Sequence, residues 1–330
     1  MRQVVASAPG KLVLSGEYAV LDGAPAICMA VDRRAMVTIA AHDGAHHVVT
    51  APGFSDSRGS FTSDSGELSW VAGGEDFELF RQVWSAAGMS SSESLATTLD
   101  TRAFRDAESG TKIGVGSSAA LTVALATALS ALCGCDNADL ARRAHRDFQG
   151  GTGSGVDVAC SLAGGVIDYR SDDAVGRGVV WPADLHYAVF WSGVAADTRS
   201  KLECLRTKSE TAARRSLGDA SERFSAAFHD GVVTVIIEEL GRYNEALHDF
   251  DVAHGLGIFD AGHAALAGAA ASHGVVYKPC GAGGGDIGIA LAAATDSLAS
   301  FADFATVSGF RQLRMSPDPR GAVLIEEEQQ

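Results

Sequence analysis

The sequence has few of the features that mark secreted, membrane-spanning or nucleic-acid-binding proteins. Its six cysteines include no CxxC pair, so neither a disulfide framework nor a zinc site is indicated. The longest apolar run, residues 119–133, is interrupted by polar residues and is too short to span a bilayer, and the N-terminus lacks the apolar middle of a signal peptide. Basic residues are scarce, 26 against 41 acidic ones, which gives a formal net charge of -15. We therefore expect a cytoplasmic protein that binds neither nucleic acid nor membrane.

Length and pattern point to an α+β protein in two parts. The chain has 330 residues, 46% of them apolar, which is enough for one large core or two of ordinary size. Strand-like and helix-like stretches mix without a regular βαβ repeat, which favours an α+β fold over a doubly wound sheet. The polar, turn-rich residues 170–178 mark a boundary. We expect one domain at 1–175 and a second at 176–330.

Local patterns predict most of the elements. Val- and Ile-rich runs predict strands, apolar residues at helical spacing predict helices, and the polar residues 56–67 predict a loop. The strands are expected at 2–8, 26–41, 94–104, 184–194, 275–278, 287–294 and 321–327. The helices are expected at 75–88, 119–133, 139–151, 198–210, 232–250, 260–274 and 297–309.

The first of four glycine-bearing motifs is APGKLVLSGEYAVLDG, residues 8–23. Lys11 follows a Pro-Gly turn and stands at the entry of an apolar strand. It is either a cation aimed at a phosphoryl group or substrate oxygen, or a solvated lysine at a turn, which is the commoner case. This motif alone does not separate the two.

The second motif, KIGVGSSAALTVAL at residues 112–125, combines two glycines with two serines before an apolar helix. Gly114 and Gly116 allow a tight turn and a close approach to a ligand. Ser117 and Ser118 lie where free amides and the helix dipole favour an anion, and a serine hydroxyl there could also reach a phosphate-bound Mg²⁺. The alternative is a plain helix N-cap, for which one serine suffices. The pattern matches neither a Walker loop nor a dinucleotide fingerprint.

The third and fourth motifs are also rich in small residues. KPCGAGGGDIGIAL, residues 278–291, carries four glycines beside a strand, which indicates close approach to a ligand or to the other glycine turn, or else a flexible hinge. GGTGSGVDVACSLAGG, residues 150–165, carries Asp157. That carboxylate could accept or orient a hydroxyl proton near a lysine, or could cap a helix.

In this order along the chain, the first three motifs resemble those of the GHMP kinases, a superfamily that includes galactokinase, homoserine kinase and mevalonate kinase. The likeness spans nearly the whole chain and is greatest to the phosphomevalonate kinase family, with Glu-Tyr at 17–18 where mevalonate kinases tend to have Glu-His. The resemblance implies a ribosomal-protein-S5-like N-terminal domain and a ferredoxin-like C-terminal domain. It also implies ATP-dependent phosphorylation of 5-phosphomevalonate to 5-diphosphomevalonate, in the mevalonate pathway of isoprenoid precursor synthesis.

The resemblance assigns roles to residues of this chain. Lys11 and Asp157 match the catalytic pair. The residues that match the nucleotide loop are Gly114, Val115, Gly116, Ser117, Ser118 and Ala119, and Ser118 also matches a Mg²⁺-facing hydroxyl. The substrate contacts suggested are Tyr18, Ser154, Arg199, Gly283, Gly284 and Gly285. Where mevalonate kinases hold Mg²⁺ with a glutamate, the comparable stretch RRAHRDF offers only Asp147.

The implied cofactors are ATP and Mg²⁺, and the implied partner is a small phosphorylated mevalonate, with a homodimer left open. Another GHMP kinase such as a mevalonate kinase, in which Asp157 would be the base, is an alternative. So is an enzyme like mevalonate diphosphate decarboxylase, which would release CO₂. A catalytically silent ligand-binding regulator is a third alternative, although Lys11, Ser118 and Asp157 are all present.

Overall fold

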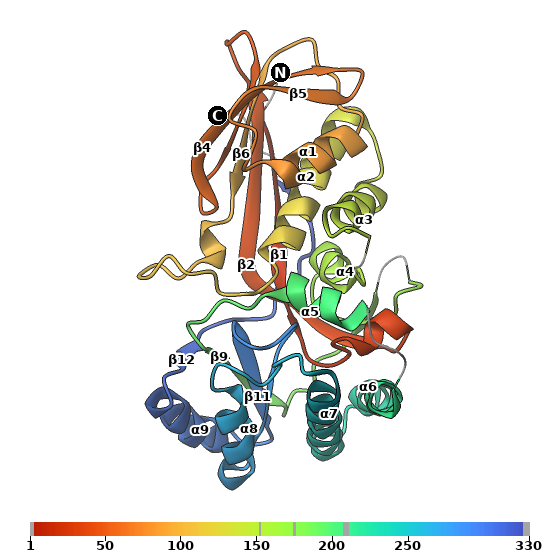
Figure 1. The fold of residues 1–330 in the computed structure, drawn as a ribbon, viewed down its shortest axis with the longest axis vertical. Helices are drawn as coiled ribbons and strands as arrows, with labels where there is room; N and C mark the ends of the chain where they lie inside the picture. The colour runs from red at the N-terminus through yellow and green to blue at the C-terminus, as the bar shows by residue number, and fades with distance from the viewer. Residues whose placement is uncertain (1–2, 152, 174–175, 207–210, 326–330) are drawn as a thin grey trace.

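The computed structural model describes residues 3–151, 153–173, 176–206 and 211–325, which form two antiparallel-rich sheets with helices packed on them (Figure 1). The α+β class predicted from the sequence is confirmed. The first sheet occupies one half of the molecule and the second sheet the other, with α4 (Val156–Ala163) and α5 (Thr198–Arg206) near their junction. Among the described residues, no helix is long and apolar enough to cross a membrane.

The first sheet is built around two long paired strands. β1 (Val4–Val13) and β2 (Ala26–Ala41) run antiparallel, and their register shifts between Pro9 and Gly10. The strand order is β13-β1-β2-β6-β3-β4-β5, and β7 pairs with both β2 and β8. The other strands are β3 (His47–Ala51), β4 (Ser55–Asp64), β5 (Glu67–Ala72), β6 (Leu95–Asp100), β7 (Val166–Tyr169), β8 (Arg177–Val179) and β13 (Val323–Ile325).

The expectation that Lys11 heads a strand after a turn is wrong. Proline and glycine at 9–10 form a bulge inside β1 instead of ending a strand, so Lys11 lies within a continuous ten-residue strand. A bulge bends the strand and redirects the side chains that follow it. Gly10 is suited to this place because a β-carbon there would lie only 2.5 Å from the carbonyl oxygen of Val115.

Helix α2 (Ser117–Cys133) forms the buried core of this half. It packs on β1 and β2, and most of its side chains are buried, as its nearly continuous apolar sequence predicts. Around it lie α1 (Glu78–Ala86), α3 (Asn137–Phe148) and α4.

The second sheet has the order β10-β11-β9-β12 and is covered by long helices. Its strands are β9 (His186–Trp191), β10 (Val276–Pro279), β11 (Ile287–Ala292) and β12 (Arg311–Leu313). Helix α9 (Thr295–Val307) packs on β9, β11 and β12, while α7 (Val233–His254) and α8 (His263–Ala270) contact β10. Helix α6 (Ala212–Asp230) packs on α7.

The two sheets do not divide the chain at a single point. β8 begins at Arg177, after the expected boundary at 175, yet it pairs with β7 of the first sheet. β13, near the end of the chain, pairs with β1. The domain limits 1–175 and 176–330 stay a prediction, and these two strands belong with the first sheet.

Two local predictions are wrong. Residues 56–67 are not a loop but most of β4 and the start of β5, because Gly59 and Phe61 point inward while their polar neighbours face solvent. Helix α6 was not predicted, since a charged outer face and Gly218 obscure its apolar spacing. Its buried residues recur at helical intervals: Leu217, Ala220, Ser221, Phe224, Ser225, Ala227 and Phe228.

Candidate active site

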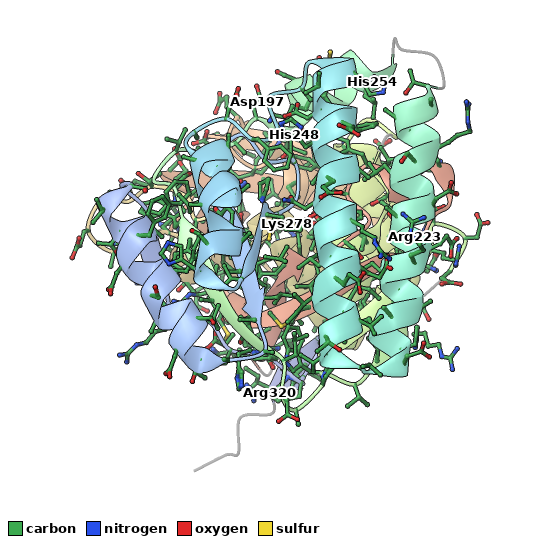
Figure 2. All side chains as sticks on the ribbon, turned by 90° about the horizontal axis from the view of Figure 1, so that it is seen from below. Asp197, Arg223, His248, His254, Lys278 and Arg320 are labelled. Carbon is green, nitrogen blue, oxygen red and sulfur yellow. The ribbon has the colours of Figure 1, made fainter. Side chains whose placement is uncertain are left out.

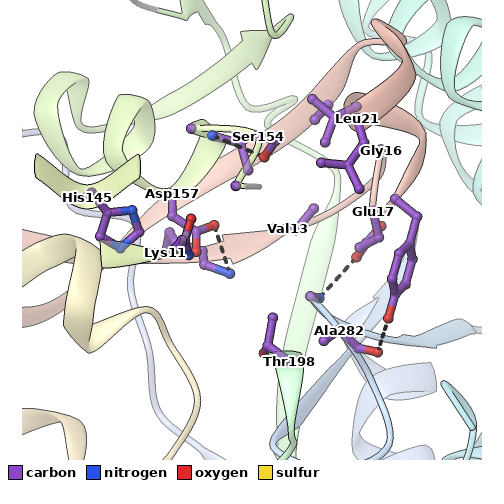
Figure 3. Close-up of a pocket in the computed structure, with 18 residues that line it drawn as sticks. Lys11, Val13, Gly16, Glu17, Leu21, His145, Ser154, Asp157, Thr198 and Ala282 are labelled. Carbon is purple, nitrogen blue, oxygen red and sulfur yellow. Dashed lines mark hydrogen bonds and ion pairs between the residues drawn. The ribbon is translucent and has the colours of Figure 1, made fainter. Parts of the chain in front are cut away.

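Lys11 and Asp157 face each other where β1 passes the start of α4. The lysine Nζ lies 3.2 Å from Oδ1 of Asp157, and the lysine side chain is only 10% exposed (Figure 3). Burial alone would lower the pKa of Lys11, but Asp157, with smaller contributions from two nearby thiols, raises that pKa above its ordinary value. The ammonium group therefore stays charged at any physiological pH.

Asp157 does not serve as a helix cap. The N-cap of α4 is Gly155, whose φ of 83° is left-handed, and Asp157 lies in the first helical turn. A carboxylate there is stabilised by the helix dipole while its oxygens remain free to meet Lys11. This geometry supports the functional alternative for Asp157 over the capping one.

The glycine-serine turn (residues 114–118) presents an uncapped helix N-terminus. Gly114 and Gly116 have φ of 93° and 80°, and Gly116 is the N-cap of α2 with no side-chain hydrogen bond to the helix. Neither serine therefore acts as the cap. The turn is held against β1 because the amide of Lys11 donates to the carbonyl of Val115 at 2.9 Å. Amides at such a terminus, next to a buried ammonium group, form a site suited to an anion.

The glycine-rich loop (residues 279–286) packs directly against this turn. A β-carbon on Gly114 would lie 2.1 Å from the carboxyl carbon of Asp286, and one on Gly281 would lie 3.7 Å from the Nζ of Lys11. Burial raises the pKa of Asp286, whose Oδ1 accepts a hydrogen bond from the amide of Ala196. The density of glycines in the two segments therefore reflects mutual close approach, as one reading of the third motif proposed.

The Lys11–Asp157 ion pair lines one cavity, and the glycine-serine turn lines a second. The Lys11 cavity is lined by both members of the pair, by Tyr18 and Ser154, and by Gly281 of the glycine-rich loop (Figure 3). The Ser118 cavity is lined by the serines of the turn and by Lys112, Arg105, Phe54 and Phe104, among other residues. Its two cations lie beside three carboxylates, those of Glu75, Asp76 and Glu78, and its aromatic side chains suit a ligand with a flat ring.

His145 is a site residue that the sequence reasoning missed. It is buried on α3, lines the Lys11 cavity, and its Nε2 lies 3.4 Å from Oγ of Ser118. Burial lowers its pKa, which the nearby Asp157 carboxylate opposes and Lys11 reinforces, so the ring is neutral near pH 7. Asp147, the acidic residue that the sequence offered near the metal position of mevalonate kinases, is exposed. Buried Leu140, Ala141 and Ala144 on the same helix give the spacing that could have placed His145 inward.

A buried ion pair behind the site was also missed. Lys278 of β10 pairs with Glu17, and their side chains are 0% and 2% exposed. The same carboxylate accepts hydrogen bonds from the hydroxyl of Tyr243 at 2.7 Å and the amide of Gly281 at 3.3 Å. Seen from below, Lys278 lies in the interior, whereas Arg223 lies toward the outer helices (Figure 2). This network ties the first motif to the glycine-rich loop.

The predicted substrate contacts are only partly brought together. Tyr18, held at a left-handed φ of 62°, and Ser154 line the Lys11 cavity, and the tyrosine hydroxyl donates to the carbonyl of Ala282 at 2.7 Å. Residues 283–285 do not line that cavity; Gly281 and Ala282 do. The carbonyl of Gly283 instead accepts a hydrogen bond from Lys201 at 2.9 Å. Arg199 belongs to α5, but its side chain lies outside the described part of the structure.

The donors present suit a metal carried by a ligand rather than one caged by the protein. Across the described residues, no group of three or more His, Cys, Asp or Glu side chains is placed to hold an ion. Mg²⁺ commonly binds through ligand phosphates, waters and one or two protein oxygens. Ser118 Oγ and the Asp157 carboxylate lie at the two cavities where such oxygens would be needed.

Known proteins resemble this chain in sequence and in fold. The family model for the GHMP kinases N terminal domain matches residues 106–165. A phosphomevalonate kinase of Streptomyces sp. (strain CL190) is 34% identical over 339 aligned positions, which cover 88% of this chain and 90% of that protein. A mevalonate kinase of Methanothermobacter thermautotrophicus is 38% identical, but over only 49% of this chain and 48% of its own length.

The fold likeness extends over almost the full length. The structure of Streptococcus pneumoniae phosphomevalonate kinase in complex with phosphomevalonate and AMPPNP aligns with a TM-score of 0.79 and 20% identity, covering 96% of this chain and 100% of that one. At this identity the likeness establishes the fold, a two-domain arrangement that the sequence resemblance had implied.

Proposed function

The chain belongs to the GHMP kinases, in the phosphomevalonate kinase family, and from this we infer that it transfers the γ-phosphoryl group of ATP to 5-phosphomevalonate. The products are 5-diphosphomevalonate and ADP, a step of isoprenoid precursor synthesis. The observation that carries this function is the 34% identity with a phosphomevalonate kinase over 88% of the chain. The Lys11–Asp157 pair, which lines a cavity next to an uncapped helix N-terminus, supports it.

The reaction makes a phosphoanhydride bond. An oxygen of the acceptor phosphate attacks the γ-phosphorus of ATP, the bond from that phosphorus to the bridging oxygen breaks, and ADP leaves with the electron pair. The acceptor phosphate is largely ionised near neutral pH, because its second pKa is about 6, so no strong general base is needed. The protein's task is to bring two anions together and to stabilise the charge that shifts between them.

The site residues divide this task. The amides of the glycine-serine turn and the start of α2 bind the nucleotide phosphates, and the Ser118 cavity takes the base and ribose. The acceptor lies in the Lys11 cavity, where the Lys11 ammonium group faces both phosphates. Asp157 holds that ammonium group in position through the 3.2 Å contact and is an orienting group more than a base.

ATP is used together with Mg²⁺ in this proposal. Ser118 Oγ would supply a protein ligand, with the Asp157 carboxylate nearby, and the ion would neutralise phosphate charge and help align the transferred group. His145 fixes the Ser118 hydroxyl at 3.4 Å from its neutral ring. We also propose a cytoplasmic location, in keeping with six cysteines that form no disulfide. A homodimer stays a prediction.

The test is ADP release from ATP and Mg²⁺ with four acceptor conditions: 5-phosphomevalonate, mevalonate, diphosphomevalonate and no acceptor. Turnover with 5-phosphomevalonate alone is expected. Turnover with mevalonate would instead make Asp157 a base in an alcohol kinase, and CO₂ release from diphosphomevalonate would indicate a decarboxylase. Nucleotide binding without turnover on any acceptor would indicate a silent regulator.

A further inference from the structure

The Lys11 cavity is built from segments that are far apart in the sequence. Lys11 and Asp157 come from β1 and α4, whereas Thr198 comes from α5 and Gly281 and Ala282 come from the glycine-rich loop (Figure 3). The cavity therefore keeps its shape only while α5 and the glycine-rich loop stay in place beside the ion pair. Contacts that fasten these two segments to each other affect the acceptor side of the site.

Lys201 of α5 makes such a contact with a single ammonium group. Its Nζ donates one hydrogen bond to the carbonyl of Gly257, in the turn that follows α7, and another to the carbonyl of Gly283, in the glycine-rich loop, both at 2.9 Å. The turn and the loop also meet directly, because the amide of Gly284 donates to the carbonyl of Ile258 at 2.7 Å. Three segments are thus joined at Lys201.

The glycine-rich loop can reach the ammonium group because it has no side chains at this point. A β-carbon on Gly284 would collide with Nζ of Lys201 and would lie 2.6 Å from the carbonyl oxygen of Gly257. Gly283 and Gly284 have φ of 66° and 74°, a left-handed backbone that glycine adopts without strain. The close approach of the loop to Lys201 therefore depends on these two glycines.

Four carboxylates act on the same ammonium group. Burial lowers the pKa of Lys201, and Asp251, Asp260, Asp197 and Asp286 oppose that shift. These residues belong to α7, the turn after it, the position before α5 and the glycine-rich loop. Without the lysine, the like charges on these segments would repel one another. Loss of the Lys201 side chain should therefore move the segments apart, in addition to removing two hydrogen bonds.

The helix that Lys201 holds also carries Thr198, one helical turn earlier. Thr198 lines the Lys11 cavity. Within the part of the chain that the structure describes, its hydroxyl has no hydrogen-bond partner. An acceptor phosphate beside Lys11 would provide an oxygen for this donor.

We propose that Lys201 is a positioning residue for the acceptor: it fastens α5 and the turn after α7 to the glycine-rich loop, and thereby holds Thr198 against the acceptor phosphate. The inference rests on the proposed function, since the ligand concerned is 5-phosphomevalonate. Lys201 itself lines neither the Lys11 cavity nor the Ser118 cavity. Among the described residues, none from α5 or the glycine-rich loop lines the Ser118 cavity, so ATP binding should not depend on Lys201.

The test is steady-state kinetics of Lys201→Met, Thr198→Val and the double variant, with 5-phosphomevalonate and ATP varied in turn. Lys201→Met is expected to raise KM for 5-phosphomevalonate about tenfold or more and to lower kcat, because the acceptor contact is displaced, while KM for ATP stays nearly unchanged. Thr198→Val is expected to lower kcat/KM for 5-phosphomevalonate about tenfold. The double variant should lose little more than Lys201→Met, since the hydroxyl is already out of position.

The control is Glu203→Gln, a charge change at an exposed residue of the same helix, which should leave both KM values unchanged. Thermal unfolding of every variant monitors the fold. Thr198 is exposed, so Thr198→Val tests the inference without disturbing the core.

Three results would overturn the inference and leave the kinase function intact. One is an unchanged KM for 5-phosphomevalonate in Lys201→Met, or a KM for ATP that rises as much. Another is unchanged acceptor kinetics in Thr198→Val, and the third is a double variant whose losses are the sum of the single ones. A wild-type chain that does not turn over 5-phosphomevalonate would remove the function and the inference together.

Discussion

A lysine that contacts a carboxylate can act as a fixed cation or as half of an acid–base pair, and the surroundings of Lys11 favour the first role. The raised pKa keeps Lys11 charged, and the acceptor phosphate supplies its own ionised oxygen. In this role Asp157 contributes by holding the Lys11 ammonium group in position. This distinguishes the site from one that must deprotonate an alcohol.

The ranking of the two residues is testable. Lys11→Met is expected to lower kcat about 10²–10³-fold, because it removes the cation that faces the shifting charge, and Asp157→Asn is expected to lower it less. Steady-state kinetics with saturating ATP and 5-phosphomevalonate provide the comparison. A larger loss for the asparagine variant would identify Asp157 as a base.

At the same scale, the residues to which we assign the chemistry have clearer sequence signals than the residues that support them. Lys11, Asp157 and the glycine-serine turn stand in motifs whose composition is unusual. Glu17 stands in the first motif and His145 in a charged helical stretch, but their partners, Lys278 and Ser118, lie elsewhere in the sequence. Local pattern contains no signal for such pairings.

At the scale of elements, burial explains which predictions failed. Strand β2 and helix α8 have local sequences that agree with their structure. Strand β4 is polar because it lies near the sheet edge with one face in solvent, and it is a strand only through pairing with β3 and β5. Tertiary contact, absent from a single-sequence pattern, decides such segments.

Helix α8 also contributes a pH-sensitive contact to the glycine-rich loop. His263 is fully buried, with Nδ1 2.8 Å from the hydroxyl of Tyr277 and Nε2 3.0 Å from the carbonyl of Gly285. Burial lowers its pKa to about 4; the hydrogen bond to the Gly285 carbonyl opposes this shift, and Lys201 and Lys278 add to it. The folded chain therefore takes up this proton less readily than the unfolded chain.

The consequence is a loss of stability in mild acid. Between pH values of about 6.5 and 4 the unfolded state binds more protons than the folded state. The free energy of unfolding therefore decreases as the pH is lowered through this range, by up to about 3 kcal/mol from this residue. Urea unfolding across that range should show a smaller fall for His263→Gln than for the wild type. Identical pH dependence in the two proteins would contradict the assignment.

At the scale of the whole molecule, one buried ion pair joins the two sheets. Glu17 follows β1 of the first sheet, and Lys278 lies in β10 of the second. Their contact also fixes Gly281 beside Lys11, so the relation between the halves sets the geometry of the site. Removing one partner from a buried pair of this kind is strongly destabilising, because the other charge is then buried without compensation.

Lys278→Met should therefore destabilise the protein by about 3–5 kcal/mol, since it leaves the Glu17 carboxylate buried without its cation. The control is Arg170→Met, which breaks an exposed pair with Glu222 and should cost at most about 1 kcal/mol. Chemical denaturation measures both. Equal effects of the two substitutions would show that the interior pair stabilises the fold no more than an exposed pair does.

The central claim is that the accepting atom is a phosphate oxygen. Phosphorus NMR of the product formed from ATP and 5-phosphomevalonate tests it most directly, because two phosphorus atoms joined through one oxygen couple to each other. The account predicts a new pair of mutually coupled signals from the product, in addition to those of ADP. A product with two uncoupled phosphomonoester signals would show transfer to the hydroxyl group and would contradict it.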